Sequence, residues 1–257
     1  MNYQKKIKLG LLSLCFIPTM VMAQNNPPQI QPTYPEVGIN WTPPNSSSTN
    51  TTTSSNNNSN SASSSSTSGG DSLQKMMTQD WGQQAATYAE TVGINADALA
   101  ATCVMESNCT NVTSTHGSIT GAFQMTQSTY NAMIKEAMVE NPSLNLTQDQ
   151  INNGQNDPTI QAIAASQYLK DGATYLKNNG ISNPNNVDVR GYYNFGTKYG
   201  AAVAKANDSD SMSTVLSGMS FSTLAANGIT SSTTVGQWRA AVANKMGASA
   251  NNSVLKS

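Results

Sequence analysis

The sequence predicts an all-α domain that follows a long polar segment. Two observations lead to this prediction. From Asp71 to Ser257 the apolar residues recur at the three- and four-residue spacing of amphipathic helices, and strand-like alternation is nearly absent. Residues 45–70 contain only Asn, Ser, Thr, Ala and Gly. Such a composition cannot bury enough apolar surface to offset the entropy of ordering the chain.

The first predicted helix covers residues 71–93. Asp71 is its expected cap, and Gly93 is its expected stop. A second helix begins after the cap Asn95. The apolar stripe of the first helix consists of Leu73, Met76, Met77, Trp81, Ala85 and Tyr88.

Two longer helices follow. One begins near Thr126 and must end before Pro142, because proline disfavours helix in the residue that precedes it. The other has Asp157 as its cap, Pro158 in its first turn and Gly180 just past its end, the usual order of these residues around a helix.

The last predicted helix stops at Gly247. Residues 207–234 are rich in Ser, Thr and Gly, and the sequence leaves open whether they pack on the domain or form a loop. The apolar face of the last helix consists of Val235, Trp238, Val242 and Met246.

The N-terminus predicts export. Three lysines precede a short apolar run, and "VMA" ends at Ala23, so residues 1–23 have the pattern of a secretory signal peptide. The apolar run is too short for a membrane span, and we expect none after cleavage. A lipoprotein anchor at Cys15 is disfavoured because Leu14 stands where a small residue is expected. Residues 24–70, with six prolines before position 45, are the predicted disordered tether of a periplasmic or secreted protein.

The charge composition excludes nucleic acid as a partner. Only 11% of the residues are charged, against roughly 25% in ordinary soluble proteins, and the net charge is -1. No basic block is present that would bind nucleic acid. The chain has one histidine, His116, and this shortage of ligands disfavours a zinc site. We expect no metal and no organic cofactor.

Two cysteines remain after the predicted cleavage, Cys103 and Cys109. In an exported protein such a pair predicts a disulfide. Residues six apart in a continuous helix are too distant to be bridged, so the helix must end near Ser107 and turn back, with Asn108 in a left-handed conformation. The alternative is a cysteine peptidase that uses one of these thiols with His116 as base.

Glu106 is the candidate catalytic acid. It lies on the same helical face as Leu99 and Cys103, which should point into the core. It also lies in the last helical turn, where the helix dipole disfavours negative charge. Both effects would raise the pKa of the Glu106 carboxyl and suit it to protonate a glycosidic oxygen. A surface glutamate at a frayed helix end is the alternative.

Three motifs follow one another in the chain. They are Glu-Ser at 106–107, "GAFQ" at 121–124 and "YYNFG" at 192–196. In this order they resemble the lysozyme-like soluble lytic transglycosylases, which include enzymes attached to secretion and conjugation machines. The resemblance covers a motif core of about 81–200 within a predicted domain of 71–257, whose C-terminal helical extension spans about 207–250. Ala122 and Phe123 stand in place of the family's Leu-Met, and bulky Tyr192 and Phe195 flank its Tyr-Asn.

The resemblance implies a role for each matched residue. Glu106 would act first as acid and then as base, and Ser107 would orient it or contact an acetamido group. The other implied glycan-binding residues are Gly121, Phe123, Gln124, Tyr193 and Asn194. Core packing is the alternative for Tyr192, Tyr193 and Phe195, and we expect it for at least one of them.

Most glycosidases use two carboxylates, and no second one has a setting like that of Glu106. The resemblance implies that the sugar's own 6-hydroxyl attacks, giving 1,6-anhydro-N-acetylmuramic acid ends on peptidoglycan strands. The alternatives are a hydrolytic muramidase and a non-catalytic peptidoglycan-binding factor of a secretion apparatus. The second carboxylates considered are Glu90, Asp97, Asp149, Asp157 and Asp188, the last as a partner of Arg190.

Overall fold

The computed structural model describes residues 70–112 and 119–257, which are mostly helical, as predicted. The signal peptide, nearly all of the tether and His116 lie outside the described residues. Two short strands pair antiparallel, with Ile119 opposite Thr126. The elements are α1 (Asp71–Met77), α2 (Gly82–Val92), α3 (Ala96–Ser107), β1 (Ile119–Thr120), β2 (Met125–Thr126), α4 (Gln127–Glu140), η1 (Pro142–Leu144), α5 (Gln148–Asn153), α6 (Pro158–Asn178), α7 (Asn186–Lys205), α8 (Met212–Val215), α9 (Phe221–Ala226), α10 (Val235–Met246) and η2 (Gly247–Ser249).

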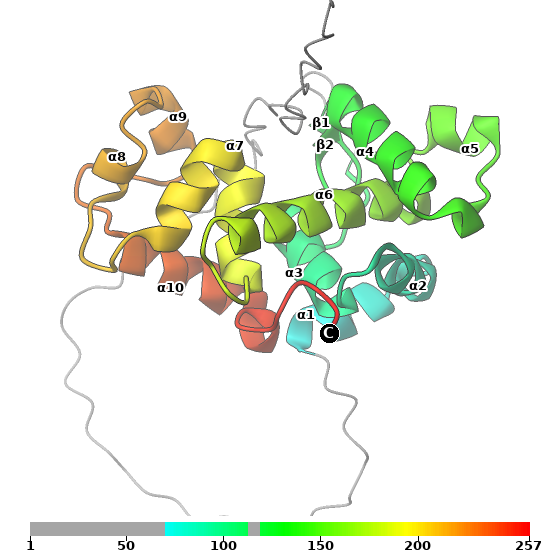
Figure 1. The fold of residues 1–257 in the computed structure, drawn as a ribbon, viewed down its shortest axis with the longest axis horizontal. Coiled ribbons are helices and arrows are strands. Elements are labelled where there is room, and N and C mark those ends of the chain that lie inside the picture. Colours follow the sequence, from blue (N-terminus) through cyan, green and yellow to red (C-terminus); the bar gives the residue numbers. More distant parts are fainter. Residues whose placement is uncertain (1–69, 113–118) are drawn as a thin grey trace, which may run out of the picture.

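Helix α6 runs through the middle of the domain (Figure 1). It packs against α2, α4 and α7, and more lightly against α3. Its predicted start is confirmed, because the Asp157 carboxylate accepts hydrogen bonds from the backbone N–H groups of Thr159 and Ile160. The start of α4 is confirmed too, with Thr126 as its N-cap.

The helix predicted over 71–93 is wrong as a single element. The chain leaves helix after Met77 and re-enters it at Gly82, and the N-cap of α1 is Gly70 rather than Asp71. The backbone of Met76 lies so close to Gly82 that a Cβ there would overlap the Met76 carbonyl oxygen. This break lets Trp81 pack edge-on against Phe123, with ring centroids 5.9 Å apart.

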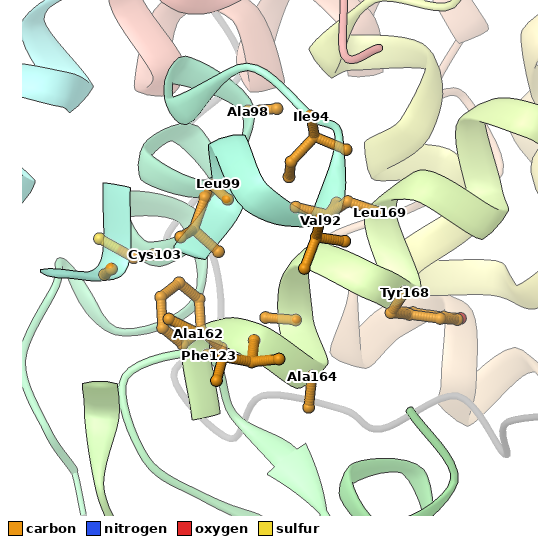
Figure 2. Packing of buried hydrophobic residues seen from close by; sticks show 14 of the residues in the cluster. Val92, Ile94, Ala98, Leu99, Cys103, Phe123, Ala162, Ala164, Tyr168 and Leu169 are labelled. Carbon is orange, nitrogen blue, oxygen red and sulfur yellow. The ribbon is translucent and has the colours of Figure 1, made fainter. Parts of the chain in front are cut away.

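Helix α3 lies in the centre of the core. Figure 2 shows Leu99 and Cys103 in one cluster with Phe123 and the apolar side of α6. Residues 97–106 of α3 are all buried. The buried face inferred from Leu99 and Cys103 therefore does not distinguish Glu106 from its neighbours, because this helix is covered on every side.

The C-terminal part packs on the domain as a second hydrophobic cluster. Helices α8, α9 and α10 lie beside α7 (Figure 1). The question left open for residues 207–234 is thereby answered, since these residues contribute Met212, Leu216, Leu224 and Ile229 to the cluster. The predicted face of α10 is confirmed, because all four of its apolar residues are buried.

The chain end returns to the first half of the domain. Ile94 and Leu255 form a β-bridge, and the Asn95 N–H donates to the Val254 carbonyl at 2.9 Å. Val254 is buried in the main core. None of the helices in the described ranges combines the length and apolar character needed to cross a membrane.

Candidate functional site

The end of α3 is closed by a disulfide. Cys103 and Cys109 are bonded, with their Cα atoms 4.7 Å apart. Helix α3 ends at Ser107, and Asn108 has the predicted left-handed conformation with φ 58°. Cys109 is left-handed as well, with φ 60°. The disulfide excludes both thiols as nucleophiles while it is intact.

Glu106 is buried, as predicted, with 4% of its surface exposed. The expected isolation of its carboxyl in an apolar setting is wrong. Its Oε1 accepts a hydrogen bond from Arg190 Nη1 of α7, and the two side chains form an ion pair. Arg190 is itself only 2% exposed. The carboxylate form is the one that pairs with a guanidinium.

The partner expected for Arg190 is therefore wrong. Asp188 instead closes the N-terminus of α7. Its carboxylate accepts from the Asn185 N–H at 3.1 Å, while the Asn185 side chain accepts from the Asp188 N–H at 2.9 Å. Burial raises the pKa of the Asp188 carboxyl, and the Asn185 hydrogen bond opposes that shift. This capping box turns Asp188 toward the helix end.

Ser107 connects the end of α3 to the 121–124 turn. Its hydroxyl donates to the Ala122 carbonyl at 2.7 Å. Gly121 has φ 89°, and a Cβ there would overlap Gln161 Oε1. The glycine therefore allows a close approach by Gln161 of α6, where we had expected a glycan. Gln161 holds the turn from both sides, since its Oε1 accepts from the Phe123 N–H and its Nε2 donates to the Thr120 carbonyl.

Phe123 and Gln124 face the interior of the domain. Phe123 is fully buried against Trp81. The Gln124 side chain is buried, and its Nε2 donates to the Gly121 carbonyl at 2.7 Å. Gln124 also has φ 45°, which a non-glycine residue rarely adopts. In this structure both residues stabilise the turn, and their predicted contacts with a sugar stay a prediction.

Tyr193 and Asn194 lie on α7, and the Tyr193 ring lies against Arg190 of the Glu106–Arg190 pair. The Tyr193 hydroxyl donates to the Phe123 carbonyl at 2.7 Å, and its ring centroid is 5.8 Å from Arg190 Cζ. Burial, followed by the charge of Glu106, raises the pKa of Tyr193 well above its usual range. Asn194 is 4% exposed. Tyr192 and Phe195 are core residues, as expected for at least one of the three aromatics.

A second cation approaches Glu106 from α10. Lys245 Nζ donates to the Met105 carbonyl at 2.9 Å, at the C-terminal end of α3. Burial and the charge of Arg190 lower the pKa of Lys245, while the charge of Glu106 raises it. The sequence interpretation named Arg190 only as a partner of Asp188, and it did not name Lys245 at all. Arg190 is one of only two arginines and stands one helical turn before Tyr193, a signal that was available.

The other carboxylates considered have local roles. Glu90 accepts from the Ala96 N–H and forms an ion pair with Lys256. Asp97 accepts from Asn252 Nδ2 at 2.8 Å. Asp157 is the α6 cap, and Asp149 lies exposed in the first turn of α5. None of these described contacts involves Glu106.

Two further features lie on α4. A groove of about 610 Å³ separates it from α5, and no predicted site residue lines it. On another face of α4 lies a carboxyl cluster. Glu136 and Glu140 of α4 meet Asp171 and the Lys170 ammonium of α6 there. Burial, followed by the charge of Glu136, raises the pKa of Asp171 to about 7. The groove is lined by Asn131, Ile134, Lys135, Met138, Val139, Gln148, Ile151 and Asn152.

Comparison with known proteins finds neither a matching family model nor a matching curated protein. The resemblance to soluble lytic transglycosylases therefore remains a prediction that rests on the three motifs. Across residues 70–112 and 119–257, no three His, Cys, Asp or Glu side chains are grouped so that they could hold a metal ion.

Proposed function

We propose that the chain is an exported peptidoglycan lytic transglycosylase in which Glu106 is the catalytic acid and base. It cleaves the β-1,4 bond between N-acetylmuramic acid and N-acetylglucosamine. The 6-hydroxyl of the muramic sugar attacks its own anomeric carbon, and the product ends in a 1,6-anhydro ring. The function is local remodelling of the cell wall.

The meeting of the three motifs is the observation that carries this proposal. Residues up to 84 positions apart converge around the end of α3. Ser107 contacts the Ala122 carbonyl, Tyr193 contacts the Phe123 carbonyl, and Arg190 contacts Glu106. A general acid has to be held at a defined place by a rigid scaffold. The disulfide directly after Glu106 adds to that rigidity.

The ion pair of Glu106 with Arg190 determines the order of the proton transfers. Its carboxylate is paired with Arg190, so it has to take up a proton and loosen this pair before it can protonate the glycosidic oxygen. After that step it is a carboxylate again and can accept the proton of the attacking 6-hydroxyl. One carboxyl group then serves both steps, and the attack is intramolecular, which favours it through proximity.

A non-catalytic glycan-binding protein of a secretion apparatus is the second candidate. The observation in its favour is the same ion pair, because a carboxylate that stays paired with Arg190 cannot act as an acid. A muramidase has less support. Asp188, one of the second carboxylates considered, is used in the α7 capping box.

The test compares Glu106→Gln with Glu90→Gln on purified peptidoglycan sacculi. Glu90 is the matched control, since it is a glutamate paired with a cation outside the site. We expect Glu106→Gln to lose about 10²–10⁴-fold in rate, because glutamine cannot deliver a proton. Glu90→Gln should cleave like the unmodified protein. Undiminished cleavage by Glu106→Gln would contradict the assignment of the acid.

Mass spectrometry of the released muropeptides distinguishes the three candidates. A transglycosylase releases anhydro ends that borohydride does not reduce. A muramidase releases reducible ends that are one water, about 18 Da, heavier, because water attacks in place of the 6-hydroxyl. Absence of any release from sacculi, with intact folding, would favour the non-catalytic binding protein.

A further inference from the structure

The Glu106–Arg190 pair leaves several buried hydrogen-bond donors unused. Arg190 Nε and Nη2 and Asn194 Nδ2 are enclosed in the protein and have no hydrogen-bond partner among residues 70–112 and 119–257. Arg190 is 2% exposed and Asn194 is 4% exposed. Buried polar groups are hydrogen-bonded in the great majority of cases, so a group of unpaired donors indicates that an acceptor belongs there.

The unpaired donors lie on one side of α7. Arg190 and Asn194 are four residues apart and both precede the break in the helix at Gly196, so their side chains leave the same face. Arg190 Nη1 is occupied by Glu106. The free Nε and Nη2 form the edge of the guanidinium that binds the two oxygens of a carboxylate in parallel.

The charges favour an anion over a neutral acceptor. Arg190 and Lys245 supply two positive charges around the end of α3, and Glu106 supplies one negative charge. One further carboxylate would balance them. A neutral acetamido or hydroxyl oxygen would accept a hydrogen bond and leave the excess charge in place.

We infer that Arg190 and Asn194 form a binding site for a carboxylate group of the glycan substrate, next to the catalytic Glu106. This inference rests on the proposed function and names its substrate class. Two parts of peptidoglycan carry such a group. The lactyl carboxylate of N-acetylmuramic acid is free where the stem peptide has been removed, and the stem peptide has carboxylates of its own.

Binding of this carboxylate would also affect Glu106. Two carboxylates on one guanidinium share its charge, so each is held less tightly than it would be alone. The arriving substrate would then weaken the ion pair that holds Glu106. Because Arg190 and Glu106 are buried in the structure, the surrounding side chains have to move before a glycan reaches them.

The experiment measures binding by calorimetry, independently of cleavage, on the mature full chain. The probes are N-acetylmuramic acid, its lactyl amide and N-acetylmuramyl dipeptide, in which the lactyl group is an amide and the peptide supplies the carboxylate. The test variants are Arg190→Lys and Asn194→Leu. The second keeps the Glu106–Arg190 pair, so it remains informative if the first does not fold. Arg239→Lys is the matched control, since Arg239 binds carbonyl groups at the end of α7 and Asp208.

We expect the unmodified chain to bind at least one carboxylate probe about tenfold more tightly than the amide, as a charge-assisted hydrogen bond allows. Tighter binding of N-acetylmuramic acid identifies the lactyl group, and tighter binding of the dipeptide identifies the peptide. Arg190→Lys and Asn194→Leu should each reduce this preference, while Arg239→Lys keeps it.

Equal binding of acid, dipeptide and amide by the unmodified chain would overturn the inference, even if the chain cleaves peptidoglycan. A preference that survives in both folded test variants would also overturn it. A carboxylate preference without cleavage of sacculi would support the binding site and count against the transglycosylase, so the two failures can be told apart.

Discussion

Arg190 of α7 and Glu106 of α3 form a buried ion pair between residues 84 positions apart in the chain. Around this pair lie the disulfide, the 121–124 turn and the aromatic side chain of Tyr193. The pair links the end of the central helix to the helix that carries the third motif. Its energetics can be tested separately from any enzymatic activity.

Replacing Arg190 of the ion pair should lower the free energy of unfolding. Arg190→Met leaves the Glu106 carboxylate buried without its cation, and such a loss typically destabilises a protein by about 3–5 kcal/mol. The double variant Glu106→Gln/Arg190→Met should recover part of this loss, since it removes both charges. Urea unfolding of the two single variants and the double variant measures the coupling. As a control, Asp208→Asn breaks an ion pair whose carboxylate side chain is 74% exposed, and should cost about 0–1 kcal/mol.

The disulfide should stabilise the fold by constraining the unfolded chain. For a loop of this length the entropy estimate is about 2 kcal/mol. Cys103→Ser/Cys109→Ser should therefore unfold at a lower temperature than the unmodified protein. Adding a reductant should lower the melting temperature of the unmodified protein and leave that of the variant unchanged. No change in either would mean that the bond contributes nothing to stability.

Gly121 should tolerate no side chain. Alanine there would meet Gln161 Oε1 and would also need φ near 89°. We expect Gly121→Ala to lose about 2–4 kcal/mol, as strain and overpacking together suggest. Gly180→Ala is the matched control, because Gly180 has a similar φ of 96° but no atom of the described residues within 4 Å of the added Cβ. A loss of about 1 kcal/mol, from backbone strain alone, is expected there. Thermal unfolding of the two variants compares the losses.

Asp171 should make the protein less stable as the pH rises. Its folded pKa, about 7, is above the ordinary value of 3.8, so the folded state binds the proton more tightly than the unfolded state. The contribution of protonated Asp171 to the free energy of unfolding is therefore lost as the pH rises from about 4 to about 7. The charged groups around it are Glu136, Glu140 and Lys170, and Gln167 donates a hydrogen bond to it.

The variant Asp171→Asn should remove this dependence. At pH 8 it should be more stable than the unmodified protein by on the order of 2 kcal/mol, with a smaller difference at pH 5. Asp80→Asn, at an exposed position in the turn after α1, is the control and should show little change at either pH. Denaturant unfolding at the two pH values measures the difference. An equal effect of Asp171→Asn at both would show that Asp171 does not titrate between them.

Local sequence signals were sufficient to predict most helix ends. Asp157, Thr126 and Asn108 lie where capping chemistry predicts them, because a cap depends on a few neighbouring residues. The disulfide was predictable for the same reason, since its six-residue separation required a turn after Ser107. The break at residues 78–81 was not predictable locally. It depends on packing between Trp81 and Phe123, which lie 42 positions apart.

The sequence alone determined the helical class, most of the caps, the disulfide and the burial of Glu106, because periodicity and short-range chemistry encode them. Only the tertiary structure decided what each buried polar group contacts. It paired Arg190 with Glu106, used Asp188 in a cap, and turned Phe123 and Gln124 inward. These contacts join residues from different helices, so their geometry depends on how the helices pack, and the local pattern around any one residue does not contain it.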